Sequence, residues 1–180
     1  MNLGGRLREA RKLIAYSFAP RNSAVYSGFD GYLNLGDEAL IQAIRKVFSP
    51  YRLCTPPQSV GGLGRALTAS RRHELAILGG GTLIGANLPD GSNPFRDRFA
   101  QIRARADRAI TFGTGVGALS ANESENKWLL EWKPLLESCS YVSVRGPESV
   151  RSLASIGIHA EMIGDPACAL AADPVEPPRC

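Results

Sequence analysis

The sequence lacks the patterns that would indicate a membrane-spanning, metal-binding or nucleic-acid-binding protein. No apolar run reaches the roughly 18 residues that a membrane-spanning helix needs. None of the four cysteines forms a C-x-x-C pair, and neither of the two histidines stands at zinc-ligand spacing. The net charge is only +4, and the basic residues are scattered without interleaved aromatic side chains. We therefore expect no metal site, no nucleic-acid partner and no integral membrane segment.

What remains is the composition of an ordinary globular domain. Its 180 residues are 44% hydrophobic and 21% charged, enough apolar material for one buried core. Cys54 and Cys139 lie in or beside apolar stretches and are interpreted as buried thiols, so nothing requires an oxidising compartment. The basic segment 1–22 has no long apolar stretch followed by a cleavage site. We expect a cytoplasmic protein in which this N-terminal extension packs on the domain as a helix or frays, with a transit peptide or a membrane-surface helix as the alternative.

Short apolar runs alternate with helical patterns along the chain. Strands are expected at 23–28, 51–55, 74–81, 108–115, 141–145 and within 159–167, and helices at 37–48, 95–106, 123–139 (one kinked at Pro134, or two) and 147–157. Parallel strands need crossover connections, which cover both faces of a sheet. The pattern therefore predicts an α/β fold, a doubly wound Rossmann-like parallel sheet over 23–170. Residues 171–180 are interpreted as a proline-rich tail or the start of an interdomain linker.

Glycine-rich turns follow the predicted strands, at the edge where ligands bind in sheets of this class. They read "GFDGYLNLGDE", "GGGTLIGANLPDG", "GTGVGALS" and "RGPES". The first lacks the G-K-[ST] ending of a P-loop, and Asp37 and Glu38 occupy the start of the next helix. A helix N-terminus favours an anion by roughly 0.3–1 kcal/mol, whereas a like charge at about 4 Å near a protein surface costs about 4 kcal/mol. A free phosphate is therefore disfavoured at this turn.

Two interpretations of this first turn stay open. In one, Asn34 or Asp37 caps the helix and Gly36 supplies the tight turn. In the other, Asn34 and Asp37 also bind neutral polar groups such as sugar hydroxyls.

The second and third turns differ in what they indicate. Gly80 and Gly81 belong to a run of three glycines followed by Thr82, more than a single tight turn needs, which favours a ligand-facing loop. The third turn fits G-x-G-x-x-A, with Gly113 and Gly115 as its first two glycines. That motif is a weak dinucleotide signal here, because the next strand does not end in an acid.

Charged residues at the predicted strand ends give one further candidate. Arg145 lies between a strand and a helix start, where it binds a carboxylate or phosphate, or pairs with Glu148 or Asp165. Asp165 precedes a proline and is expected to close the last strand and cap its turn. His73 and His159 stand at predicted strand entrances, away from the ligand edge, and neither is expected to be a catalytic base.

Four segments together resemble the polysaccharide pyruvyl transferases. "GYLNLGDEALIQAI", "AILGGGTLI", "TFGTGVGAL" and "SVRGPESVRSLASIGI…IGDPA" occur in the order, and at about the spacing, of that family. The N-x-G-D-E-A element, and the D-P-A that follows an S-x-x-x-L-x-x-x-G-I helix, are the more specific parts. The resemblance runs from about Val25 to Leu170. One departure is that the family commonly has Arg-Asp where this chain has Arg145 and Gly146.

The resemblance implies transfer of pyruvyl from phosphoenolpyruvate, as a ketal, to a hydroxyl pair of a cell-surface polysaccharide, with no other cofactor. It also implies the N-terminal half of a GT-B-like two-domain protein, with the general acid and most donor-binding residues in a C-terminal half absent from this chain. The chain alone is then expected to be inactive. A non-enzymatic sugar- or nucleotide-binding domain and a nucleotide-sugar glycosyltransferase are the alternatives. The implied substrate-binding residues are Asn34, Gly36, Asp37, Gly80, Gly81, Thr82, Gly113, Gly115 and Arg145.

Overall fold

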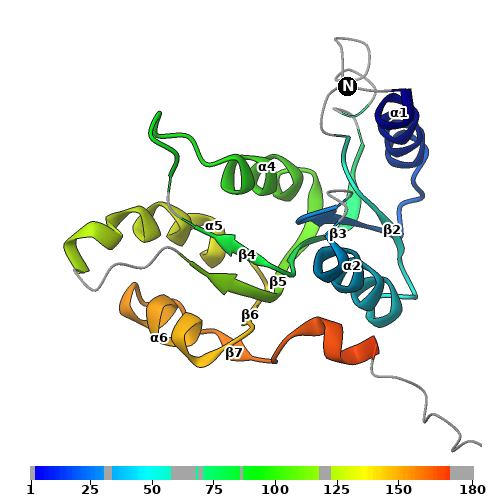
Figure 1. Ribbon diagram of the computed structural model, residues 1–180. Coiled ribbons are helices and arrows are strands. Elements are labelled where there is room, and N and C mark those ends of the chain that lie inside the picture. Colours follow the sequence, from blue (N-terminus) through cyan, green and yellow to red (C-terminus); the bar gives the residue numbers. More distant parts are fainter. Residues whose placement is uncertain are drawn as a thin grey trace, which may run out of the picture.

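A parallel sheet forms the centre of the molecule (Figure 1). The computed structural model describes residues 3–30, 34–57, 68, 71–85, 87–117 and 123–170. In them, seven strands run in the order β2-β1-β3-β5-β6-β7, with β4 paired to β5, and every pair is parallel. The Rossmann-like α/β prediction is confirmed. The strands are β1 (Ser23–Ser27), β2 (Arg52–Cys54), β3 (His73–Gly79), β4 (Thr82–Ile84), β5 (Ala106–Val116), β6 (Tyr141–Val144) and β7 (Glu161–Met162).

Helices bury both faces of this sheet. Alternate strand residues point to opposite faces, so Tyr26 and Ile77 pack with Ile44 of α2 in one cluster, whereas Val25 and Leu78 join a second, larger cluster. The larger cluster includes side chains from α1, α4, η1, α5 and α6. The helices are α1 (Leu3–Ser17), α2 (Leu35–Val47), α4 (Pro94–Arg103), α5 (Lys133–Glu137) and α6 (Pro147–Ser155), with 3-10 helices η1 (Glu123–Trp132) and η2 (Pro166–Leu170).

Helix α2 starts where its capping residue predicts. Asn34 has an extended backbone, and its side-chain oxygen accepts a hydrogen bond from the Gly36 N–H at 3.0 Å. This pairing satisfies one of the donors that a helix start leaves free. Ile41 and Ile44 then turn the apolar stripe of the helix onto the sheet. Of the two predicted caps, Asn34 is the one observed.

Helix α1 packs on the domain, which confirms one of the two expectations for the N-terminal extension. Tyr16 is buried, and its ring lies 4.7 Å from the ring of His73. Lys12 forms an ion pair of 2.8 Å with Asp30, which follows β1. These contacts hold one side of the helix against the sheet.

The segment predicted as one kinked helix or two forms two. Pro134 stands in the first turn of α5, where its missing N–H leaves no helix bond unmade, and η1 ends just before it. The fully buried Trp132 joins the two and donates its indole N–H to the Gly85 carbonyl at 3.1 Å. Asn122, which precedes η1 in the sequence, lies outside the described part of the chain, as do the loop from Gln58 and the tail 171–180.

The sheet also differs from the prediction at one edge. Thr82–Ile84, expected to be loop, forms β4 and pairs with the end of β5. The Gly115 N–H donates to the Gly81 carbonyl at 2.8 Å, so β5 continues to Val116. The predicted strand 108–115 is confirmed, and Gly113 and Gly115 lie inside it rather than in the glycine-rich turn to which the pattern also assigned them. The pairing of Gly115 with Thr82 of β4 was not apparent from the sequence pattern.

Gly28 lets the end of β1 approach the end of β3, and this close approach gives a stability prediction. A Cβ at Gly28 would lie 2.2 Å from the Tyr26 hydroxyl and 2.6 Å from the Gly79 carbonyl oxygen. Gly28→Ala is therefore expected to lower the free energy of unfolding by about 1–3 kcal/mol. The matched control is Gly85→Ala, whose Cβ meets nothing within 4 Å. Urea unfolding of both variants is the measurement, and equal stability would contradict the packing account.

Candidate functional site

The carboxyl ends of the strands gather the residues that the sequence pointed to. β1 and β3 are neighbours, yet the chain leaves β1 toward β2 on one side and leaves β3 toward β5 on the other. Doubly wound folds bind their ligands outside the strand ends at such a reversal. The loop after β1, the glycines after β3 and Arg145 after β6 all lie at this edge.

The start of α2 supplies polar groups to one side of the edge. Asn34 is exposed, and its oxygen is used by the helix cap, whereas Asp37 is half-buried in the first turn. Burial, and then Asp30 and Asp37, raise the pKa of Tyr26, so its hydroxyl stays protonated and donates to the Gly79 carbonyl at 2.7 Å. Two carboxylates therefore lie close enough to affect this hydroxyl, in keeping with the argument against a phosphate.

The glycines after β3 have a packing role. A Cβ at Gly80 would meet the Leu40 side chain of α2 at 3.1 Å, and one at Gly81 would meet the Phe29 ring at 3.0 Å. Both residues have positive φ, of 68° and 57°, which favours glycine. Leu40 and Phe29 therefore fill the space beside the two Cα atoms, and no room is left there for a ligand. The backbone N–H and C=O groups of Gly80 and Gly81 can still contact a ligand, as expected from the sequence.

Arg145, Thr82 and Asp165 form a polar cluster at this edge, which links the end of β6 with the start of β4 and the segment after β7. The guanidinium of Arg145 donates to the Thr82 hydroxyl at 3.0 Å and lies 3.5 Å from a carboxylate oxygen of Asp165. The second oxygen of Asp165 accepts from the Ala167 N–H at 2.9 Å. The predicted pairing with Asp165 and the predicted cap of the turn are both observed, whereas Glu148 pairs with Arg151 instead.

This cluster holds a cation in a fixed orientation without covering it. The side chains of Arg145 and Asp165 are 37% and 38% exposed. A guanidinium has five N–H donors, and the two contacts leave others for a ligand. Such a fork matches a carboxylate or a phosphate. Asp165 was expected only as a structural residue, and the Asp-Pro step after the last strand was its signal in the sequence.

Gly115 and Gly113 relate to this cluster in different ways. Gly115 lies against it, since a Cβ there would be 3.1 Å from the Thr82 hydroxyl oxygen and 3.3 Å from an Arg145 nitrogen. Gly113 is buried, and a Cβ there would be 2.3 Å from Pro166. The structure therefore brings Gly115 to the cluster and places Gly113 beneath η2.

The contact of Gly115 gives a prediction about ligand binding. Gly115→Ala is expected to push Arg145 away from Thr82 and to weaken anion binding about three- to tenfold, the equivalent of one hydrogen bond. The matched control is Gly146→Ala, which is next to Arg145 but meets nothing within 4 Å. Titration of both variants with phosphoenolpyruvate is the measurement. Equal affinities would show that the Thr82 contact does not orient the arginine.

Gly146 stands where the resembling family commonly has an acid. It is the N-cap of α6, with φ −147° and ψ 167°, and no side chain caps the helix. The open space around its Cα would accept a side chain. The start of α6 is therefore without a side-chain cap in this chain.

Both histidines lie far from this cluster along the sheet, at its amino edge. His73 is buried at the start of β3, where Ser23 lies 2.7 Å from its Nδ1. Burial, with Arg71 and Arg105 nearby, lowers its pKa to about 4. His159 precedes β7 and is exposed. The expectation that neither acts at the ligand edge agrees with these positions.

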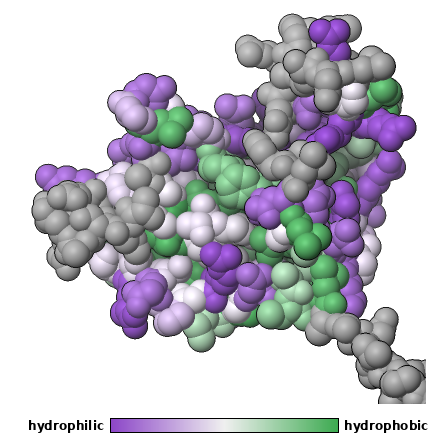
Figure 2. Space-filling model, viewed as in Figure 1, coloured by the Kyte–Doolittle hydropathy of each residue, from purple (hydrophilic) through white to green (hydrophobic). Residues whose placement is uncertain are grey.

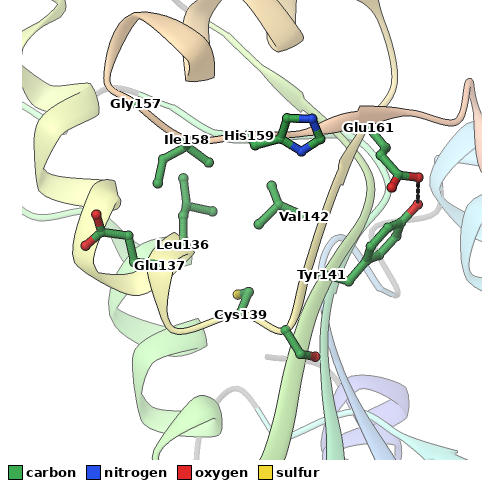
Figure 3. A pocket seen from close by; sticks show the side chains of 10 residues that line it. Leu136, Glu137, Cys139, Tyr141, Val142, Gly157, Ile158, His159 and Glu161 are labelled. Atoms are coloured by element: carbon green, nitrogen blue, oxygen red, sulfur yellow. Dashed lines mark hydrogen bonds between the residues drawn. The ribbon is translucent and has the colours of Figure 1, made fainter.

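A second concavity lies at this opposite edge, around His159 (Figure 3). It has a volume of about 420 Å³, with Leu136, Val142 and Ile158 on its apolar side. Glu161 accepts a hydrogen bond from the Tyr141 hydroxyl at 2.8 Å on its rim. Its lining includes two carboxylates, Glu137 and Glu161, and no lysine or arginine, in contrast to the edge at Arg145.

Cys54 and Cys139, the two cysteines predicted to be buried, do not add a reactive centre. Cys54 is buried as predicted, and burial raises its pKa to about 12. Cys139 is half-buried, and its pKa is also raised to about 12 by burial. Neither thiol is a nucleophile at neutral pH. Within the described residues, no three His, Cys, Asp or Glu side chains gather as metal ligands.

Comparison with known protein families shows which family contains this chain. A sequence model described as polysaccharide pyruvyl transferase matches residues 34–179, which include the start of α2, the Thr82 strand and Arg145. The chain belongs to the polysaccharide pyruvyl transferase family. A search of curated proteins finds no match. The family region begins at the α2 cap, Asn34, so α1 and β1 precede the part that this pyruvyl transferase family chain shares with the family model.

Proposed function

We propose that this chain is the acceptor-side half of an enzyme that transfers pyruvyl from phosphoenolpyruvate to two hydroxyls of a polysaccharide sugar. The family match supports the general activity and a polysaccharide acceptor. The observation that carries the proposal is the cluster of Arg145, Thr82 and Asp165 at the carboxyl edge. It offers an oriented cation for an anionic donor at the edge where folds of this class bind ligands.

The two sides of the edge then have different partners. Arg145 binds the carboxylate or phosphate of phosphoenolpyruvate, and Thr82 and Asp165 hold it in place. Asn34 and Asp37, at the acidic start of α2, bind the sugar hydroxyls, since a hydroxyl can donate to a carboxylate where a phosphate would be repelled. The backbone around Gly36, Gly80 and Gly81 lines the space between them.

The reaction needs a proton donor, and the described residues at the carboxyl edge include no histidine. Protonation of the methylene carbon of the enol phosphate generates an oxocarbenium-like centre, and the two sugar hydroxyls add in turn while the bond to phosphate breaks, which gives the ketal and inorganic phosphate. Of the two protons that the hydroxyls release, one balances the proton taken up by the methylene carbon and the other leaves with the phosphate. His73 and His159 lie at the opposite edge. We therefore propose that the general acid comes from a second half of the protein, and that the chain alone does not turn over. Because phosphoenolpyruvate is a cytoplasmic metabolite, we assign the activity to the cytoplasm.

Thermal denaturation with candidate ligands tests the proposal. Phosphoenolpyruvate is expected to raise the melting temperature of the chain more than inorganic phosphate does, because it binds the native state. Stabilisation by a nucleotide sugar instead would indicate a glycosyltransferase. Stabilisation by free saccharide alone would indicate a sugar-binding domain. Turnover of phosphoenolpyruvate and acceptor by the 180-residue chain would contradict the half-enzyme proposal.

A further inference from the structure

The net charge of the protein is concentrated at its N-terminus. The first 22 residues contain five basic residues and one acidic residue, which equals the formal net charge of +4 for the whole chain. Acidic and basic residues therefore balance over the rest of the sequence. Most of this charge lies on α1, and the six residues are Arg6, Arg8, Glu9, Arg11, Lys12 and Arg21.

The outer side of α1 also carries exposed apolar side chains. Leu7, Ile14 and Phe18 are 53%, 60% and 71% exposed. Their spacing of seven and four residues puts them on one stripe of the helix and its end. Arg11 falls within this stripe, and it is exposed too. In Figure 2, hydrophobic and hydrophilic surfaces lie next to each other over α1.

Contacts on the inner side of α1 fix the rotation of the helix about its axis, and therefore keep the outer apolar stripe exposed. Tyr16 is 2% exposed and packs on His73, and Lys12 pairs with Asp30 at 2.8 Å. The helix cannot turn its apolar stripe inward without breaking these contacts. Leu7, Ile14 and Phe18 therefore stay on the exposed side of α1, while the opposite side of the helix packs on the domain.

We propose that the outer face of α1 docks on the surface of an anionic lipid bilayer. Leu7, Ile14 and Phe18 would enter the boundary between headgroups and acyl chains, and Arg6 and Arg11 would contact lipid phosphates. An apolar stripe beside arginines is the pattern of a helix that lies in the plane of the interface. No helix in the described ranges is long and apolar enough to cross a bilayer.

Charge complementarity identifies the partner as an anionic surface. The other strongly exposed leucines on helices and loops, Leu35, Leu88 and Leu130, have acids close by in sequence, at Asp37, Asp90 and Glu131. Only the α1 stripe, of these four places, combines apolar exposure with several arginines. The proposal concerns residues before the region matched by the family and does not depend on the proposed transferase function.

Vesicle sedimentation with the full chain tests this proposal. Vesicles of equimolar phosphatidylcholine and phosphatidylglycerol are expected to bind the protein, and vesicles of phosphatidylcholine alone are not. The double variant Ile14→Glu and Phe18→Glu is expected to lose binding by about tenfold or more, and Arg6→Gln with Arg11→Gln by a similar factor. The matched control is Leu130→Glu, which changes a similarly exposed residue outside α1 and is expected to bind normally.

Circular dichroism shows whether the variants are folded, and the native-state spectrum is required of each. Added salt should release the wild-type protein, since the attraction is screened. Absence of binding, equal binding to neutral vesicles, or binding that survives both double variants would overturn the proposal. A concentration-dependent dimer that Ile14→Glu with Phe18→Glu abolishes, measured by light scattering without lipid, would also overturn it by assigning the stripe to a second copy.

Discussion

Arg145→Gln is expected to lower kcat/KM for phosphoenolpyruvate by about 10- to 100-fold in the full-length enzyme. A hydrogen bond to a charged group contributes about 1.5–3 kcal/mol, and this variant removes both the charge and the fork that would bind the donor. Stability should change by less than about 1 kcal/mol, because the ion pair with Asp165 is more than a third exposed. Steady-state kinetics and urea unfolding measure the two effects separately.

Two further variants separate charge from geometry. Arg145→Lys keeps the charge but loses the planar fork, and it should recover only part of the lost activity. Arg108→Gln removes another exposed arginine, which pairs with Glu74 at 2.9 Å away from the carboxyl edge, and it should leave activity unchanged. If Arg145→Gln behaves like Arg108→Gln, the arginine does not bind the donor.

Acid is expected to destabilise the protein through His73. The pKa of this buried imidazole is lowered from 6.5 to about 4 in the folded chain. Below about pH 6.5 the unfolded chain binds a proton that the folded chain does not take up until about pH 4, so falling pH favours unfolding across this window. The loss amounts to about 3 kcal/mol and is complete near pH 4. Above pH 6.5 this group leaves stability independent of pH.

Urea unfolding at a series of pH values isolates this contribution. His73→Phe keeps a ring against Tyr16 and removes the titrating group, so its stability should fall less than that of the wild type between pH 6.5 and 4. His159→Gln changes an exposed histidine and should follow the wild-type curve. Parallel curves for His73→Phe and wild type would show that the buried imidazole does not cause the acid sensitivity.

The sequence pattern predicted the elements whose cause is local. The apolar stripe of α2, its cap at Asn34 and the uniformly apolar strand around Ile77 depend on residues close together in the chain, and the structure has all three. The pairing of β4 with the end of β5 was not predictable in this way. It depends on the path of the chain, which continues beside β5 after two glycines with positive φ. Such a pairing is a contact between segments that are distant in the sequence, and the pattern of apolar residues does not indicate it.

The candidate site shows the same division. The pairing of Arg145 with Asp165 followed from charges at two predicted strand ends of a parallel sheet, and it is observed. The contact with Thr82 depends on β4 and could not be read from spacing. The packing role of Gly80 was hidden because glycine runs serve both ligand loops and close helix approach. Only the position of Leu40 in space distinguishes the two.

The central claim is that the carboxyl edge around Arg145 binds the anionic donor. Titration of the ¹⁵N-labelled chain with phosphoenolpyruvate, followed by amide chemical shifts, tests this claim most directly. The account predicts saturable shifts at Thr82, Gly115 and Arg145 that Arg145→Gln abolishes. Shifts centred instead on Tyr141 and His159, at the opposite edge, would contradict it.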